Sequence, residues 1–322
     1  MAVETTFDFD MMLSSAREAY GEELMAIADE GIDFAFVCSD NAPASCSAGK
    51  MMAKYPERCV NVGIAEQDEV GISTGLALSG KVVFAQVFGP FLPLRAADQI
   101  HTDAAYNDVN VRLIGTHSGV TSGGGPTHNV VADLALYRAI PNLTICVPAD
   151  AGQCRKIIRA SLTYQGPMII RISRGGEPDV YANNDYDFEI GKAITVRDGN
   201  DLTLIGCGPS VYWSLMASKE LEKRGIHARV VDMHTIKPFD AEMVIKCAKE
   251  TGAIVTAENH NVTCGLGSVV SNCLAKNCPT VQEFVGVQDL FGQVGPQDFL
   301  MDEYGLRAAN IVAAVKKAIS RK

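Results

Sequence analysis

Two histidines and two arginines have side chains and positions suited to binding an anionic ligand. His117 follows a strand-like run, and open α/β sheets place ligand sites at such strand ends. His128 stands beside the glycine-rich stretch SGVTSGGG and just before a helical segment, where backbone N–H groups converge. Arg17 and Arg174 carry planar guanidinium groups, which donate two hydrogen bonds at once to a phosphate. A surface ion pair explains either arginine equally well.

Glu66 is the acid with the clearest case for a chemical role. It lies in the segment NVGIAEQ at the start of a helical pattern, where the helix dipole alone also favours an acid. The neighbouring Glu69 is interpreted as a solvated acid of this kind. Phe88 and Phe91 follow the next strand-like run and are explained by core packing. Asp40, at another strand end, is explained as a cap of the next element.

The elements that must position these residues alternate regularly along the chain. Short β-branched runs between longer helical patterns predict βαβ units, and near-continuous apolar strands indicate sheets covered on both faces. A segment rich in Gly, Pro, Asn and Asp at 175–191 is interpreted as a linker. We therefore expect an α/β protein of two domains, 1–185 and 186–322, each a mostly parallel sheet with helices on both faces. The first domain's predicted strands are 34–39, 81–87, 110–116, 143–148 and 167–173.

Composition excludes several classes of partner. The formal net charge of -10 argues against nucleic acid and anionic membrane surfaces. The chain shows no signal peptide and no apolar run long enough to span a bilayer. Ten scattered cysteines without a CxxC pair predict reduced thiols and a cytoplasmic location. His234 and His260 are spaced too loosely for a metal site, so we expect satisfied structural histidines and no metal ligand in this chain.

A series of short motifs, in order through both halves, resembles one enzyme family. They are AREAYG at 16–21, NVGIAEQ, RAADQI, PTHNVVADLALYRAIPN, VPAD, DMHTIKP, GAIVTAENH and GLGS. The chain resembles the C-terminal half of transketolases, and specifically the smaller subunit of split transketolases. The resemblance implies a thiamine-diphosphate pyrimidine-binding fold followed by a transketolase C-terminal-like fold. It also implies transfer of a two-carbon ketol group between sugar phosphates. The departure from the family pattern at Gly124 extends this expectation to unusual or branched sugar phosphates.

The resemblance implies a cofactor shared between two chains. The glutamate matching Glu66 hydrogen-bonds the aminopyrimidine of thiamine diphosphate, the aromatics matching Phe88 and Phe91 line that ring, and Asp40 matches an aspartate near the cofactor. The chain lacks the Gly-Asp-Gly…Asn segment that holds the diphosphate and Mg²⁺. An N-terminal partner subunit is therefore expected to hold both, in a two-plus-two heterotetramer.

The same resemblance assigns the substrate residues. The histidines matching His117 and His128 face the reacting carbonyl and hydroxyls, in proton transfer and oxyanion stabilisation. Arg174 and Arg17 match arginines that bind the substrate phosphate. The family aspartate associated with the substrate's C2 hydroxyl is replaced by Gly124, in a loop one residue shorter. We therefore expect altered recognition of ordinary aldoses.

Two further positions depart from the family pattern. Leu94 replaces a third pocket aromatic, and the family segment Glu-Glu-His is here Glu258-Asn259-His260. Two alternatives remain open from the sequence. One is the β subunit of a 2-oxo acid dehydrogenase E1 component, which has a similar length and a GIAEQ-like segment. The other is a non-catalytic regulatory or binding partner on a transketolase scaffold, which the replacement at Gly124 favours and the retention of Glu66 opposes.

Overall fold

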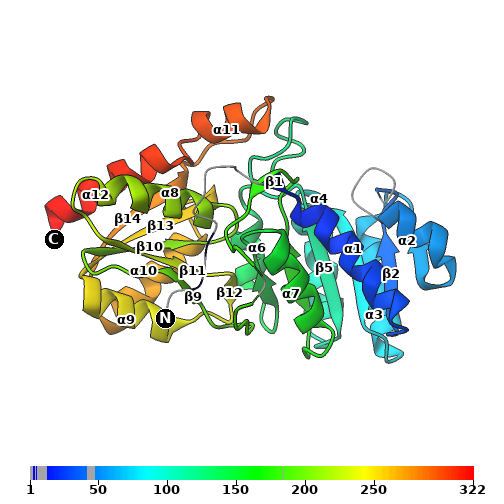
Figure 1. Ribbon diagram of the computed structural model, residues 1–322. Helices are drawn as coiled ribbons and strands as arrows, with labels where there is room; N and C mark the ends of the chain where they lie inside the picture. Colours follow the sequence, from blue (N-terminus) through cyan, green and yellow to red (C-terminus); the bar gives the residue numbers. More distant parts are fainter. Residues whose placement is uncertain (1–2, 4, 6–12, 42–47, 184) are drawn as a thin grey trace.

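The computed structural model describes residues 3, 5, 13–41, 48–183 and 185–322. In this part of the chain two mainly parallel sheets stand beside one another, each flanked by helices (Figure 1). The α/β fold class predicted from the sequence is confirmed. A short antiparallel pair joins β1 (Leu13–Ser14) to β8 (Glu177–Pro178).

The first sheet has seven strands in the order β12-β6-β7-β5-β4-β2-β3, parallel except for β12. The β-branched runs of the sequence form its centre, where both faces are buried. The strands are β2 (Ala35–Cys38), β3 (Cys59–Asn61), β4 (Val83–Phe88), β5 (Val111–Thr116), β6 (Thr144–Cys146), β7 (Met168–Arg171) and β12 (Thr235–Lys237).

Helices cover both faces of this sheet. One face packs against α1 and α7, and the other against α3 and α6, in two separate clusters of buried apolar side chains. The helical segments are α1 (Ala16–Asp29), α2 (Ala48–Lys54), η1 (Pro56–Arg58), α3 (Glu66–Leu78), α4 (Phe91–Arg95), α5 (Ala97–Gln99), the π-helical η2 (Ile100–Ala105), α6 (Asp133–Ala139) and α7 (Ala151–Ser161).

The second sheet has five strands in the order β14-β13-β10-β11-β9, with only the edge strand β9 antiparallel. Helices α8 and α12 pack together on one side, and α9 and α10 on the other (Figure 1). The elements are β9 (Ile194–Arg197), β10 (Leu202–Gly206), α8 (Ser210–Glu222), β11 (Ala228–Asp232), α9 (Ala241–Thr251), β13 (Ala253–Asn261), α10 (Leu266–Asn277), β14 (Val281–Val287), α11 (Gln297–Glu303) and α12 (Ala308–Arg321).

The two halves are more closely joined than a linker at 175–191 suggests. Strand β12 belongs to the second half of the chain but extends the first sheet beside β6. Within 175–191, the N–H groups of Val180 and Tyr181 donate to Asp150 Oδ2 at 2.9 and 3.0 Å, and the Tyr181 hydroxyl donates to Asp232 at 2.6 Å. The segment is therefore a packed connection, and the boundary at residue 185 stays a prediction.

Two further observations concern the described residues alone. Their nine cysteines are free thiols, and Cys46 lies outside the described part of the chain. None of their helices combines the length and apolarity that crossing a membrane requires.

Candidate functional site

The candidate residues meet at the carboxyl edge of the first sheet. Strands β7, β5 and β4 are neighbours and run parallel, so the segments that leave them start at the same edge. Phe88 is the last residue of β4, His117 follows β5 directly, and Arg174 lies three residues beyond β7. The fold thus brings together side chains that are up to 86 positions apart along the chain (174 − 88).

An aromatic cluster forms the centre of the site. The Phe88 ring lies 4.6 Å from the His117 ring and 6.0 Å from the His128 ring, centroid to centroid. Phe91, at the start of α4, lies 6.0 Å from Phe88 and 5.4 Å from His128. All four contacts have the edge-to-face geometry that aromatic rings prefer. The cluster joins both candidate histidines to both candidate cofactor aromatics.

His117 is held in an unusual backbone conformation. Its φ of 61° lies in the left-handed region, which is strained for a residue with a side chain and costs on the order of 1–3 kcal/mol. The ring is 8% exposed, and its Nδ1 lies 3.0 Å from the Thr116 hydroxyl. This conformation points the ring into the aromatic cluster instead of along the strand.

Burial and the charges around His117 keep its ring neutral. Burial is the largest cause, and together with the positive charges of Arg17, Arg174 and His128 it lowers the pKa of His117 to about 4. Arg17 and Arg174 therefore both lie close enough to act on this ring, although they come from α1 and from the segment after β7. A neutral imidazole keeps one nitrogen that can accept a proton.

A pH titration checks this assignment. The unfolded chain protonates His117 near pH 6.5 whereas the folded chain does so near pH 4, so protons bind the unfolded state preferentially between those values. The stability that this neutral ring contributes is complete above about pH 6.5 and is lost as the pH falls toward 4. We expect the His117 ring signal in NMR spectra to stay constant from pH 8 to 5, with the urea-unfolded chain as control. A midpoint near 6.5 in the folded protein would contradict the arrangement.

Glu66 has a partner that the sequence did not reveal. It is the first residue of α3 and is 5% exposed, and Arg95 Nη1 donates to its Oε1 at 2.8 Å. The Arg95 guanidinium also lies 3.9 Å from the Phe91 ring centroid. Glu66, Arg95 and Phe91 thus form a continuous series of contacts into the aromatic cluster. The only signal for Arg95 was its place in the RAADQI motif.

The interpretation of Glu69 as a solvated acid is wrong. Its side chain is 1% exposed and accepts a hydrogen bond from the Ser39 hydroxyl. Burial raises the pKa of Glu69 well above its usual value, and the nearby negative charge of Glu66 raises it further. Glu69 lies three residues after Glu66, which places its side chain on the buried side of α3. The short motif NVGIAEQ did not reveal this.

Asp40 lies at the same edge of the sheet but makes different contacts. It follows β2 with a φ of 54°, is exposed, and exchanges hydrogen bonds with Asn61 at 3.0 and 3.2 Å. Among the described residues, no contact joins Asp40 to the aromatic cluster. Its predicted place near a cofactor remains a prediction.

The glycine-rich loop is packed directly on His128. A Cβ atom at Gly124 would lie 2.8 Å from the His128 Cβ and 2.9 Å from its Cγ, closer than real Cβ contacts. The loop backbone folds back on itself, because the N–H of His128 donates to the Gly125 carbonyl at 2.9 Å. The observed position of His128 therefore requires a glycine at position 124. The replacement of the family aspartate does more than remove a carboxylate.

The two candidate arginines are available for an anion. Arg174 is exposed, and within the described residues it makes no hydrogen bond or ion pair. Arg17 makes one long ion pair with Glu18 at 3.4 Å, and its buried Nε has no hydrogen-bond partner there. Both guanidinium groups therefore retain donors that a bound phosphate could satisfy.

The histidines of the second half are buried but only half satisfied. His234 Nδ1 lies 2.9 Å from the Thr235 hydroxyl, and His260 Nδ1 lies 2.7 Å from the Asn261 carbonyl. The Nε2 atom of each has no hydrogen-bond partner among the described residues, so the expectation of fully satisfied histidines is wrong. Across that part of the chain, no group of three or more His, Cys, Asp or Glu side chains could hold a metal ion.

Comparisons with known proteins match both halves of the chain. Residues 14–177 match the family described as the transketolase pyrimidine-binding domain, and residues 191–311 the family described as the transketolase C-terminal domain. The chain is 38% identical to a 6-deoxy-6-sulfo-D-fructose transketolase subunit of Clostridium sp. strain MSTE9, over 95% of each chain. It is 40% identical to an apulose-4-phosphate transketolase subunit of Phocaeicola vulgatus, over 91% of this chain and 93% of that protein.

A solved structure has the same fold over the same length. It is a split-gene transketolase in the form of an inactive beta4 tetramer, and it superposes with a TM-score of 0.87 at 40% identity. The match covers 95% of this chain and 98% of that one. These similarities do not favour either alternative considered from the sequence, the dehydrogenase β subunit or the non-catalytic scaffold.

Proposed function

Because this chain belongs to the transketolase family, we propose that it supplies the aminopyrimidine and substrate side of an active site completed by a second chain. The reaction is transfer of a two-carbon ketol group between sugars. The observation that carries the proposal is the continuous series of contacts from Glu66 through Arg95 and Phe91 to His128 and His117. One set of contacts therefore joins a carboxylate, two aromatic rings and two imidazoles.

The residues present fit the aminopyrimidine end of thiamine diphosphate. When bound, this cofactor supplies a nucleophilic carbon that carries the two-carbon group. In the described part of the chain, the second carboxylate oxygen of Glu66 accepts no hydrogen bond and is free for a ring nitrogen. Phe88 and Phe91 offer apolar ring surface beside it. Glu66 would hold and exchange a proton at the pyrimidine while the aromatic rings exclude water.

The two histidines would act on the substrate. His117, whose pKa is lowered to about 4, is neutral at physiological pH and can accept a proton from a hydroxyl at one ring nitrogen. His128 lies 6.0 Å from the Phe88 ring, centroid to centroid, and can donate a hydrogen bond to a carbonyl oxygen. Both imidazoles contact the Phe88 ring, so the two would act on neighbouring atoms of a bound sugar.

Arg174 and Arg17 would bind the anionic end of the substrate. One relative is named for a sugar phosphate and the other for a sulfo sugar, and both anions are tetrahedral groups that suit a guanidinium fork. We expect Arg174→Ala and Arg17→Ala each to raise KM for a phosphorylated or sulfonated sugar about tenfold or more, and KM for the free sugar less than twofold. Arg224→Ala, which removes an exposed charge in the turn after α8, is the control. An equal effect on charged and free sugars would exclude the anion-binding role.

Exposed apolar groups around Glu66 support a shared site. Ile64 is 76% exposed and Leu94 is 65% exposed, on the two segments that flank the Glu66 carboxylate. Gly75, on α3, has no atom within 4 Å of the position its Cβ would take. Large apolar groups exposed beside an active-site acid are typical of a surface that a partner chain covers. A two-plus-two heterotetramer, Mg²⁺ held by the partner and a cytoplasmic location are parts of the same proposal.

Purification from the protein's own cells tests the shared site. With an affinity tag on this chain, native mass spectrometry is expected to find an equimolar second chain with bound thiamine diphosphate and Mg²⁺. The isolated chain, as control, is expected to bind no thiamine diphosphate and transfer no ketol group. The inactivity of the related split-gene beta4 tetramer agrees with that expectation. A lone homo-oligomer that turns over sugars without a partner would exclude the proposal.

A further inference from the structure

The loop that joins the two candidate histidines is held by the second domain. The N–H of Val120 donates to Asn259 Oδ1 at 3.0 Å, and Asn129 Nδ2 donates to the Gln293 carbonyl at 3.2 Å. Next to the loop, the N–H of Asn261 donates to the Val131 carbonyl at 3.0 Å. The substrate loop, defined here as residues 118–130, thus has two hydrogen bonds to β13 and the segment after β14, with a third at the adjacent Val131.

Asn259 is the most constrained of these contacts. Its side chain is 3% exposed, and Arg171, itself paired with Asp133, donates to its backbone carbonyl oxygen at 2.9 Å. Gly119 lies directly against the carboxamide, because a Cβ there would be 2.6 Å from the Asn259 Cγ. The φ of Gly119 is +79°, which favours glycine as well. The loop backbone and the amide are therefore fitted to each other in both shape and hydrogen bonding.

Both departures from the family pattern involve the same loop. Asn259 replaces the middle glutamate of the family segment, and the loop that it holds carries Gly124 in place of the family aspartate. The two positions are 135 residues apart (259 − 124), yet one side chain supports the backbone on which the other lies. Asn259 therefore acts on the loop that carries Gly124 through Val120 and Gly119, and does not contact Gly124 itself.

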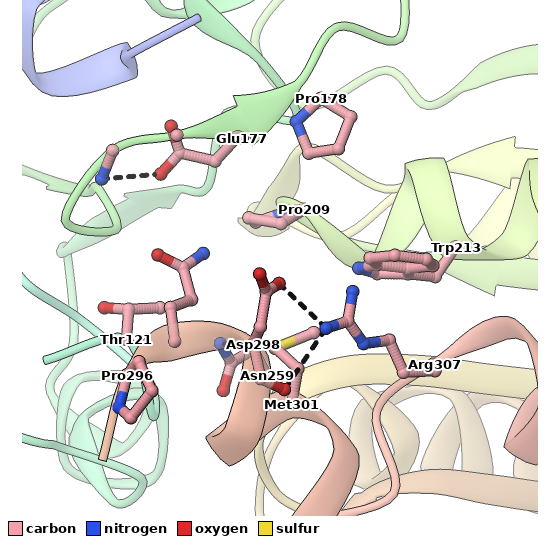
Figure 2. Close-up of a pocket in the computed structure, with 13 residues that line it drawn as sticks. Thr121, Glu177, Pro178, Pro209, Trp213, Asn259, Pro296, Asp298, Met301 and Arg307 are labelled. Carbon is pink, nitrogen blue, oxygen red and sulfur yellow. Dashed lines mark hydrogen bonds and ion pairs between the residues drawn. The ribbon is translucent and has the colours of Figure 1, made fainter. Parts of the chain in front are cut away.

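The contact between the loop and Asn259 borders a cavity. A cavity of about 210 Å³ lies between the two domains, and Thr121 of the loop and Asn259 both line it (Figure 2). The far wall includes Trp213 and Arg307, whose guanidinium lies 4.6 Å from the indole ring centroid. Val120 itself is buried against Val287 and Leu300, so apolar packing of this side chain and the hydrogen bond to Asn259 hold the loop together.

We propose that Asn259 is a specificity-determining positioning residue, which fixes the substrate loop and thereby the spacing of His117 and His128 around the sugar hydroxyls. The inference rests on the proposed function and deepens it. Asn259 does not touch the substrate: it acts through Val120 and Gly119. Glu66 and Phe88 lie on other elements, so loss of this contact changes sugar recognition and not cofactor binding.

The test uses the complex with its partner and thiamine diphosphate. Asn259→Leu keeps nearly the same shape but removes the acceptor, whereas Asn259→Asp keeps the acceptor. The readout is the ratio of kcat/KM for two sugar phosphates that differ only in the configuration of the hydroxyl next to the carbonyl. We expect Asn259→Leu to change that ratio at least fivefold, mainly through KM, and Asn259→Asp to change it less than twofold. The dissociation constant of thiamine diphosphate is expected to change less than twofold in both.

Gln153→Ala is the matched control for a general loosening of the domain junction. Gln153 donates to Asp232 across the same junction at 2.6 Å but does not touch the substrate loop. If Gln153→Ala shifts the ratio as much as Asn259→Leu, or if Asn259→Leu leaves it within twofold, the proposal is wrong. Should Asn259→Leu fail to assemble, Asn259→Ala removes the same acceptor with a smaller side chain and carries the same criteria.

Amide hydrogen exchange separates this inference from the proposed function. Peptides that cover 118–130 are expected to exchange at least tenfold faster in Asn259→Leu than in the wild type, whether or not the complex turns over sugars. Unchanged exchange would show that Asn259 does not hold the loop. Faster exchange in the variant, together with a wild-type complex that lacks ketol transfer, would instead count against the proposed function alone.

Discussion

Replacing Glu66 by glutamine is expected to lower kcat for ketol transfer by about 100- to 10,000-fold, the usual range for loss of a positioned proton-transfer group. Glutamine keeps the size of the side chain and can still accept the hydrogen bond of Arg95, which now measures 2.8 Å. It cannot exchange a proton at the aminopyrimidine. We expect thiamine diphosphate binding to weaken by less than about tenfold, because one charge-assisted hydrogen bond becomes a neutral one.

The fold should tolerate this change. Removing the negative charge leaves Arg95 without its counter-ion, but its side chain is 48% exposed and water can solvate it. Asp68→Asn, the same change at an exposed acid in the same helical turn, serves as control and should keep wild-type kcat. Stopped assays on the assembled complex measure kcat, and circular dichroism on the same complex checks that the fold is kept. Turnover of Glu66→Gln at the wild-type rate would exclude the proton-transfer role.

Substituting alanine for Gly124 is expected to lower kcat/KM by about 10- to 100-fold, the scale on which a displacement of about 1 Å acts in an active site. The added Cβ would lie 2.8 Å from the His128 Cβ, so either the loop or the imidazole must move. We expect Gly124→Asp, which restores the residue of the family pattern, to be at least as damaging and not to restore recognition of ordinary aldoses. An aspartate at position 124 would have its Cβ atom in the same unfavourable position.

The adjacent glycine provides a matched control. A Cβ at Gly123 would meet its nearest atom, the Gly295 carbonyl oxygen, at 3.5 Å, an ordinary van der Waals contact. Gly123→Ala should therefore keep kcat/KM within about threefold, although it changes the same loop by the same methyl group. Kinetics with a panel of sugar phosphates distinguish the two variants. Equal effects of the two substitutions would show that loop flexibility, and not contact with His128, controls the rate.

Local sequence signals were enough for the main elements of the fold. The five strands predicted for the first domain agree with β2, β4, β5, β6 and β7 to within two residues at each end. Each is a short β-branched run that is buried on both faces, so its composition reflects its environment directly. The short edge strands β3 and β12 were missed, because a three-residue strand carries little periodicity and depends on the neighbour it pairs with.

The sequence by itself determined the fold class and the set of residues at the carboxyl edge of the first sheet, because strand ends in a parallel sheet share one edge whatever the details of packing. Only the tertiary structure decided which of them have partners. Arg95 meets Glu66 across 29 positions, Glu69 turns into the core, and Asn259 reaches Val120 across 139 positions. Such contacts join residues far apart along the chain, where no local pattern specifies the pairing. They exist only once the sheets and helices are packed against each other.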